Sequence, residues 1–416
     1  MKLPKIGIHY KSLEHIGGIE RVVSELARIF STSSEYVSII TEEPILFLKD
    51  RIKCDVLLLD SANREASLSD FIKNNQIEWL IFNDPSHQHI EEDIATSHNI
   101  NCKVALIIHF SFPSPIYFTE ASKLYSRVVS VGKLVDALAC VSEMDAYCWG
   151  SLGIKTYHVQ NPFVHSEPSE TITGPSSNSI IWVGRGSSQK KPFSAIDIME
   201  LVIRKVPDAR LKMIGVGPMK KDLLNYAKDK HIDNNIEIIS ETNNVGQYYA
   251  QAKIHLLTSV TESFCLVIAE AKQFGLPTVM YSIPFLELIE TRKGVCVHEL
   301  NDNVAMADSI IKLFNDDTLY KSMHEEALES LKPFNDSNVI KSWRNLFNDK
   351  KEYQKNNAEE GIAELIKAWN LFVSENWWKL DFCENIDKII PFSLQKLAGK
   401  FLSAIQKVKL IKRRLK

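Results

Sequence analysis

The sequence lacks the features of several protein classes. No apolar run approaches the roughly 20 residues that a membrane-spanning helix needs, and residues 1–18 contain no long apolar segment typical of signal peptides. The seven cysteines are scattered, odd in number and never spaced as Cys-x-x-Cys, which argues against a disulfide framework or a cysteine metal site. We therefore expect a protein that stays in the cytoplasm with reduced thiols.

Basic and acidic residues are nearly equal in number, but they are unevenly distributed along the chain. The formal net charge of −3 argues against a nucleic-acid partner. Residues 388–416 contain nine lysines and arginines and no acidic residue, so the rest of the chain is distinctly acidic. Helical periodicity separates an apolar face of this tail from a basic one: Leu394, Leu397, Phe401, Ile405 and Val408 against Lys396, Lys400 and Lys407. The tail is predicted to bind an anionic membrane surface, and packing on the acidic body is the alternative.

Short apolar runs alternate with helical patterns along most of the chain. Runs such as "EWLIFN" and "KVALIIHF" are typical of strands buried on both faces of a parallel sheet, so we predict an α/β protein. A chain of 416 residues is too long for one core, and the polar segment 161–179 resembles a linker. We predict Rossmann-like domains over residues 1–165 and 166–347, with ligands in the cleft between them, and a helical extension over 348–416.

In the second predicted domain, two segments place candidate ligand-binding residues directly after strands. "SIIWVGRGSSQKKP" carries Arg185, Lys190 and Lys191 in a glycine-containing loop, and such cations suit a diphosphate, although ordinary surface charge is the alternative. "ARLKMIGVGP" ends in Gly215 and Gly217, which would let the backbone approach a ligand closely or would serve only to turn the chain.

A third segment, "TESFCLVIAEAKQFG", holds two glutamates around an apolar run. Glu262 precedes a predicted helix, and Glu270 falls one to two turns inside it. The first helical amides and the helix dipole would attract an anion; they belong to Phe264, Cys265 and Leu266. A carboxylate at that place could accept hydrogen bonds from sugar hydroxyls or stabilise positive charge on a sugar ring. The alternative is a capping acid followed by a solvated helix residue.

These three segments, in this order, resemble the second domain of the retaining glycosyltransferases of family 4, which have the GT-B fold. The family motifs VGR…K, GxGP and E-x7-E correspond to "WVGRGSSQKKP", "IGVGP" and "ESFCLVIAE…FGLPTV". The resemblance implies that Arg185 and Lys191 hold the diphosphate of a nucleotide-sugar donor. It further implies that Glu262 and the nearby amides contact the transferred sugar and that Glu270 binds the ribose. Because a proline replaces the family's glycine after the lysines, Lys190 remains an alternative to Lys191.

The first predicted domain carries weaker parts of the same resemblance, over roughly residues 1–347 in all. "HIGGIER" is similar to the family's GG-x-E-R segment, which implies that Gly17 and Gly18 let the backbone approach the donor phosphate or the acceptor. "LIIHFSFPSP" places His109 at a strand end, where the family has a histidine on the acceptor side, although a buried core histidine is the alternative. No Asp-x-Asp triplet occurs, so we expect fixed cations instead of a metal.

The resemblance implies a retaining transferase for a UDP- or GDP-linked sugar. The acceptor would be a glycan or a polyprenyl-linked oligosaccharide in polysaccharide or lipopolysaccharide biosynthesis, at the inner face of the cell membrane. We expect neither a resident cofactor nor a metal. The alternatives are a nucleotide-sugar 2-epimerase and a catalytically silent GT-B subunit.

Overall fold

The computed structural model describes residues 2–13, 17–45, 52–114, 121–164, 178–242, 244–283 and 286–350. The chain divides into two compact units, unit 1 with residues 1–162 and 334–416 and unit 2 with residues 163–333. The predicted helical extension and its basic tail lie outside the described residues, apart from 348–350. Among the helices described, none is both long and apolar enough to cross a bilayer.

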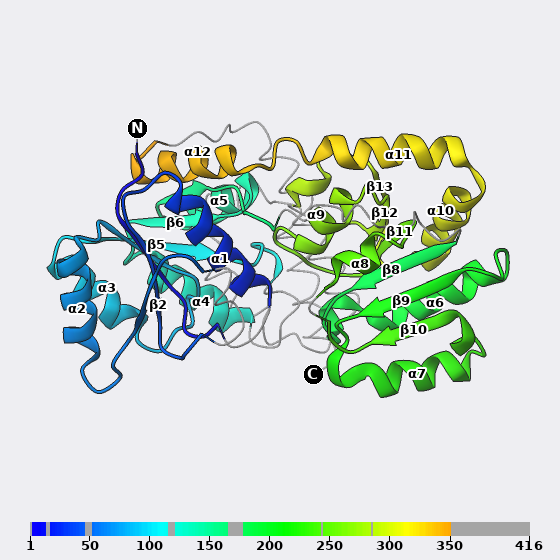
Figure 1. The fold of residues 1–416 in the computed structure, drawn as a ribbon, viewed down its shortest axis with the longest axis horizontal. Coiled ribbons are helices and arrows are strands. Elements are labelled where there is room, and N and C mark those ends of the chain that lie inside the picture. The colour runs from blue at the N-terminus through cyan, green and yellow to red at the C-terminus, as the bar shows by residue number, and fades with distance from the viewer. Residues whose placement is uncertain are drawn as a thin grey trace, which may run out of the picture. The chain divides into compact units, whose positions relative to one another are not determined.

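Unit 1 contains a seven-stranded, all-parallel sheet in the order β3-β2-β1-β4-β5-β6-β7. Its strands β2, β5 and β6 are labelled in Figure 1. Its strands are β1 (Ile6–His9), β2 (Val37–Thr41), β3 (Asp55–Leu58), β4 (Trp79–Phe82), β5 (Lys103–Ile108), β6 (Ala137–Cys140) and β7 (Thr156–His158). Its helices are α1 (Gly18–Ser31), α2 (Arg64–Asn75), α3 (Ile90–Asn99), α4 (Ala121–Gly132), α5 (Glu143–Gly150) and α12 (Asp336–Phe347).

The central strands of unit 1 are buried on both faces, as their apolar runs predict. Every residue of β1, β2, β4 and β6 is buried. The prediction was wrong for β3, where Val56 and Leu58 are 44% and 50% exposed. The reason is the strand's place at the sheet edge, where the described residues provide a neighbouring strand on one side alone.

Unit 2 contains a six-stranded parallel sheet in the order β10-β9-β8-β11-β12-β13. Its strands are β8 (Ser179–Val183), β9 (Arg210–Ile214), β10 (Ile236–Ile239), β11 (Ile254–Leu257), β12 (Thr278–Tyr281) and β13 (Val295–His298). Its helices are α6 (Pro192–Ile203), α7 (Lys220–Asp229), α8 (Gly246–Tyr249), α9 (Leu266–Gln273), α10 (Asn303–Asn315) and α11 (Asp317–Ser330). The short strand β13 was not predicted.

Alternate residues of β8 enter two separate hydrophobic cores, because successive strand side chains point to opposite faces. Ile180 and Trp182 join the core that contains side chains of α6, α7 and α10. Ile181 and Val183 join the core formed with α8 and α9. Helices therefore cover both faces of this sheet. Their packing holds in place the strand ends next to the candidate site.

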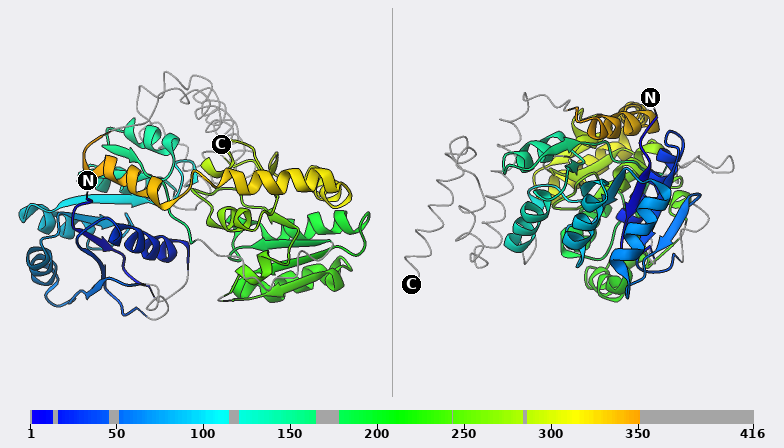
Figure 2. Two further views of the ribbon diagram at one scale, coloured as in Figure 1. Left: turned by 45° about the horizontal axis from the view of Figure 1, so that its top comes forward. Right: turned by 90° about the vertical axis from the view of Figure 1, so that its left-hand side faces the viewer.

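The last described helix, α12, belongs to unit 1 although it follows the whole of unit 2 in sequence (Figure 2). Trp343 is fully buried, and its ring meets that of Phe30 in α1 edge to face with centroids 5.4 Å apart. The Phe347 ring packs on that of Trp79 in a tilted arrangement, with centroids 5.2 Å apart. The predicted second domain ended at residue 347, and this boundary was wrong because the aromatic face of α12 is buried against unit 1.

Both sheets show the strand order 3-2-1-4-5-6 of doubly wound folds, with the order reversing between β1 and β4 and again between β8 and β11. In such sheets, ligands bind beyond the carboxyl ends of the strands at the point of reversal. The predicted pair of Rossmann-like domains is therefore confirmed, and residues that follow β1, β4, β8 and β11 are the first to inspect for function.

Candidate active site

The loop after β8 carries the predicted cations in three different environments. Arg185 is exposed, and among the described residues it forms no hydrogen bond or ion pair. Lys190 ends a short 3-10 turn, and Lys191 adopts a left-handed conformation (φ 44°) directly before α6. Pro192 is the first residue of α6, a position that needs no backbone N–H and suits the fixed φ of proline.

Lys190 forms a buried ion pair with Glu262. Its Nζ lies 2.5 Å from Glu262 Oε1, and the two side chains are 14% and 10% exposed. Burial, the largest single effect, would lower the pKa of Lys190, but the raising effects, led by the charge of Glu262 and including its hydrogen bond, exceed it in sum. The pKa of Lys190 is therefore raised, and the lysine stays cationic. Lys190 therefore joins the cation loop to the E-x7-E segment, a contact that was not predicted from the sequence.

Hydrogen bonds between the β8–α6 loop and the segment after β11 hold this pair in place. The Thr258 hydroxyl donates to the backbone oxygen of Lys190 at 2.7 Å. Gln189 accepts from the Val260 amide at 2.9 Å through its backbone oxygen and donates to the Thr261 oxygen at 2.8 Å through its side chain. Lys191 instead donates to the side chain of Asn301. The two adjacent lysines are therefore held by different partners.

The helix after Glu262 begins later than predicted. We expected it to include Phe264, but α9 starts at Leu266, and Cys265 precedes it in a left-handed conformation (φ 64°, ψ 71°). A non-glycine residue in this region costs about 1–2 kcal/mol, and such strain is often found at functional sites. The side chain of Cys265, the residue before the helix, makes no capping hydrogen bond to its first amides.

Glu270 is buried rather than solvated. Its residue is 9% exposed, and the Tyr249 hydroxyl from α8 donates to its Oε2 at 3.1 Å. Glu262 is equally buried. The simpler alternative, in which Glu270 is an ordinary solvated helix residue, is therefore wrong, and both carboxylates of the motif lie in partly desolvated surroundings where they interact more strongly with partners.

The glycines of this region allow two loops to pack closely. A Cβ at Gly186 would lie 2.4 Å from the backbone oxygen of Val216. Gly215 has φ +87°, a conformation that glycine adopts without strain. Gly217 also has a positive φ, and nothing lies within 4 Å of a Cβ built there. Close packing explains the glycine at Gly186, and the positive φ explains the glycine at Gly215. At Gly217, the space beside the backbone is open.

In unit 1, the predicted His109 follows β5 and belongs to a hydrogen-bonded chain. Its Nε2 lies 2.9 Å from Asn83 Oδ1, and Asn83 Nδ2 donates to the backbone oxygen of His9 at 3.1 Å. Burial lowers the pKa of His109 to about 4, so the ring is neutral at neutral pH. Asn83 was not singled out from the sequence, although its place directly after the buried run "WLIF" was a usable signal.

Gly17 and Gly18 lie at the beginning of α1, as predicted. Gly17 is the residue before the helix, with extended backbone (φ −106°, ψ −170°), and Gly18 is its first residue. As a glycine, Gly17 has no side chain with which to cap the helix.

Comparisons with known proteins agree with this architecture. Residues 168–330 match the family model described as glycosyl transferases group 1. An uncharacterized glycosyltransferase of Haemophilus influenzae is 26% identical, over 83% of this chain and 100% of its own length. A poly(glycerol-phosphate) alpha-glucosyltransferase of Bacillus subtilis is 24% identical over 44% of this chain, but only 27% of its own length is covered.

Among solved structures, the Anabaena protein HepE in complex with UDP and glucose superposes with a TM-score of 0.68. It shares 15% sequence identity, and the match covers 83% of this chain and 100% of that one. At this identity the likeness shows the fold alone. The family match over unit 2 and the two Rossmann-like units together support a glycosyltransferase of the GT-B fold.

Proposed function

We propose that the protein transfers a sugar from a nucleoside-diphosphate donor to a glycan acceptor with retention of anomeric configuration, as in the family 4 transferases that its motifs resemble. The observation that carries this proposal is the buried Lys190–Glu262 pair beside exposed Arg185, at the reversal point of β8 and β11. A diphosphate and a sugar ring need such neighbouring cationic and anionic groups.

In this proposal, Lys190 and Arg185 bind the donor diphosphate. Arg185 is exposed, and Lys190 stays charged although it is buried, so both offer a cation to phosphate oxygens. The backbone amides at the start of α9 add a partial positive charge. Fixed donors of this kind stabilise the diphosphate as it leaves, and removal of one costs on the order of 3 kcal/mol, about 100-fold in rate.

Once the donor diphosphate is bound to Lys190, the Glu262 carboxylate contacts the transferred sugar. The carboxylate then stabilises the positive charge that develops as the anomeric C–O bond breaks. The acceptor hydroxyl oxygen forms the new bond on the same face, and its proton passes to the departing phosphate oxygen. Glu270, oriented by Tyr249, accepts hydrogen bonds from the ribose. The neutral His109 lines the acceptor side, and Gly17 and Gly18 offer backbone amides at the start of α1.

The acceptor is proposed to be a glycan or a polyprenyl-linked oligosaccharide of cell-surface polysaccharide or lipopolysaccharide biosynthesis. The Bacillus subtilis relative is named for a polymeric acceptor and an α-linked product, which supports a polymeric acceptor and would correspond to retention with an α-configured donor. The Anabaena structure with UDP and glucose supports a UDP-linked donor over a GDP-linked one. No resident cofactor takes part in this scheme.

A thermal-shift titration with UDP, GDP and ADP tests the donor site. UDP is expected to raise the melting temperature selectively, because a ligand at 100 times its Kd stabilises the folded state by about 2.7 kcal/mol. Lys190→Ala should abolish most of this UDP-dependent shift, whereas the matched variant Lys191→Ala should keep it. Each variant is compared with its own ligand-free melting temperature, since Lys190→Ala also leaves Glu262 without its cation.

The opposite result, in which the shift is lost in Lys191→Ala and kept in Lys190→Ala, would show that Lys191 rather than Lys190 binds the diphosphate. No shift with any of the three nucleotides at millimolar concentration would favour the silent subunit. If a UDP-sugar is instead converted to its C2 epimer without any acceptor, the protein is an epimerase.

The basic tail, residues 388–416, is proposed to hold the protein at an anionic membrane surface on the cytoplasmic side. Each lysine or arginine near such a surface contributes about 1 kcal/mol. In a liposome flotation assay, the full chain should float with vesicles that contain anionic lipid and should remain in solution with neutral ones. A variant with Lys396, Lys400 and Lys407 changed to glutamine should float less. Equal flotation of both proteins would contradict this role.

A further inference from the structure

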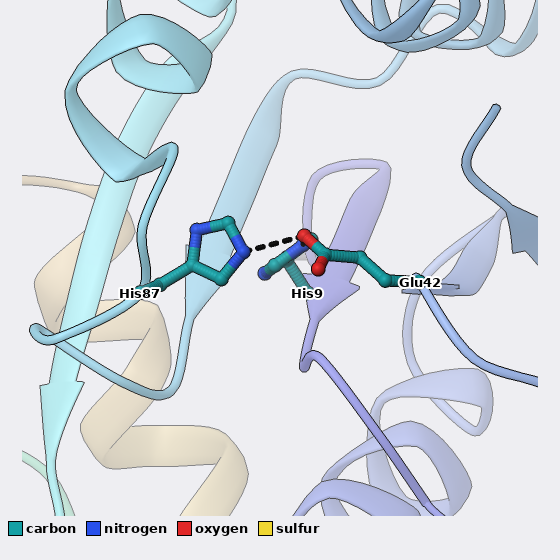
Figure 3. A group of neighbouring side chains, drawn as sticks. All are labelled: His9, Glu42 and His87. Carbon is teal, nitrogen blue, oxygen red and sulfur yellow. Dashed lines mark hydrogen bonds and ion pairs between the residues drawn. The ribbon is translucent and has the colours of Figure 1, made fainter. Parts of the chain in front are cut away.

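A second group of polar side chains gathers at the point of reversal in the sheet of unit 1, apart from every residue used above for donor binding. His9 is the last residue of β1, Glu42 directly follows β2, and His87 lies in the turn between β4 and α3. Because β2, β1 and β4 are neighbours in the sheet, the three side chains converge beyond its carboxyl edge (Figure 3). One ligand atom from each lies within 4.8 Å of the other two.

The two imidazoles are buried, and each has a nitrogen that lacks a hydrogen-bond partner. His9 and His87 have side chains that are 2% and 3% exposed. Among the described residues, His9 Nε2 and His87 Nδ1 accept and donate no hydrogen bond. A buried polar atom without a partner costs about 1–3 kcal/mol, so His9 Nε2 indicates a site built to hold a ligand. The His87 ring would bind through its other nitrogen, Nε2, and its Nδ1 would then carry the ring proton. His9 Nε2 faces Glu42 Oε1 at 3.8 Å, too far for a hydrogen bond.

We propose that His9, Glu42 and His87 bind a divalent transition-metal ion of the zinc class. Two imidazole nitrogens and one carboxylate oxygen form a ligand set that zinc accepts, with a further position left for water or a substrate oxygen. The ion takes the place between His87 Nε2 and Glu42 Oε1, which are now joined directly at 2.5 Å.

Neighbouring groups fit this assignment. His87 Nδ1 faces Asp93 Oδ2 at 4.0 Å, so when Nε2 binds the metal, the ring proton on Nδ1 points at a carboxylate. Zinc-bound histidines are usually oriented by a second carboxylate in this way. Asp93 is itself held by Arg64, whose Nε and NH2 donate to its two oxygens at 2.8 and 2.6 Å.

Arg64 also contacts Glu42, through NH1 at 2.6 Å from Oε1. One guanidinium thus faces two carboxylates, and with neutral histidines the group keeps one negative charge that a dication can offset. The Glu42 side chain is 19% exposed, whereas the two imidazoles are buried. An ion therefore enters from the side of the Glu42 carboxylate.

The site is linked to the acceptor-side histidine by two hydrogen bonds. The His9 backbone accepts from Asn83, which in turn bonds to His109. A metal at His9 therefore fixes the end of β1 and, through Asn83, the orientation of the His109 ring. This placement concerns unit 1 alone and does not depend on which nucleotide unit 2 binds.

The test is a zinc titration of the full chain after removal of metals with a chelator, in competition with a chromophoric zinc indicator. One zinc ion per chain should bind, and Mg²⁺ should not compete at millimolar concentration. His87→Gln and Glu42→Gln should each weaken zinc binding at least about 100-fold, since even outer-shell changes cost 10–100-fold. His89→Gln is the matched control, because His89 pairs with Glu92 at the surface in the same turn region and should leave the affinity unchanged.

Unchanged zinc affinity in both His87→Gln and Glu42→Gln would overturn the proposal. The Co²⁺ absorption spectrum of the unmodified protein decides the matter if these variants do not fold. Nitrogen and oxygen ligands give visible d–d bands without a thiolate-to-metal charge-transfer band. A thiolate band would assign the ion to cysteine and would likewise overturn the proposal.

Discussion

Replacing Glu262 with glutamine is expected to lower the rate of sugar transfer at saturating donor by about 100-fold or more. Glutamine has nearly the same shape, but it lacks the negative charge that, in the proposed mechanism, stabilises the developing positive charge of the sugar ring. Loss of one preorganised electrostatic group in such a site costs about 2.7–4 kcal/mol. The measurement is the initial rate of sugar release from the donor at saturating concentration, with UDP affinity measured in parallel.

The matched control for this change is Glu237→Gln on β10, where the side chain is 58% exposed. It should retain the rate of the unmodified protein. A Glu262→Gln protein with near-normal turnover would remove the E-x7-E glutamate from the chemistry. A protein with normal turnover and weakened donor binding alone would restrict Glu262 to binding, because uniform binding losses change KM rather than kcat.

Replacing Trp343 with alanine is expected to destabilise unit 1 by about 3–5 kcal/mol, the usual cost of removing a buried tryptophan or phenylalanine. Trp343 is fully buried in α12 and packs on Phe30 and Phe347. Urea unfolding followed by tryptophan fluorescence and circular dichroism should show an earlier transition for unit 1. The UDP-dependent shift, which depends on unit 2, should persist below that transition.

Leu328→Ala is the control for this second change, because Leu328 is 42% exposed on α11. It should move the unfolding midpoint little, as surface substitutions usually stay within about 0.5 kcal/mol. An unfolding curve of Trp343→Ala that coincides with that of the unmodified protein would contradict the packing of α12 on unit 1.

The parallel sheets could be predicted from the sequence because their central strands are buried on both faces. Apolar runs such as "WLIF" in β4 indicate this environment directly. The edge strand β3 has the same apolar pattern but is exposed. The sequence of a single segment does not show whether its strand lies at the centre or at the edge of the sheet. The position of α12 could not be predicted either, because its partner helix α1 lies some 300 residues earlier in the sequence.

The candidate site shows the same limit at the scale of single residues. The motif order selected Arg185, Glu262 and Glu270 as candidates, but the choice between Lys190 and Lys191 depended on a backbone conformation. The left-handed φ at Lys191 separates the side chains of Lys190 and Lys191, and no local sequence pattern predicts this conformation. The histidines of the proposed metal site were missed because His9, Glu42 and His87 are adjacent only through the order β2-β1-β4.

The return of the chain to unit 1 has a consequence for biosynthesis on the ribosome. The aromatic surface around Phe30 is made early, yet its cover, the Trp343 face of α12, leaves the ribosome only after all of unit 2 has been translated. Domains generally fold as units during synthesis, at about 5–20 residues per second. The nascent chain therefore carries an uncovered apolar patch for roughly ten seconds or more, which is a natural binding surface for chaperones that protect emerging chains.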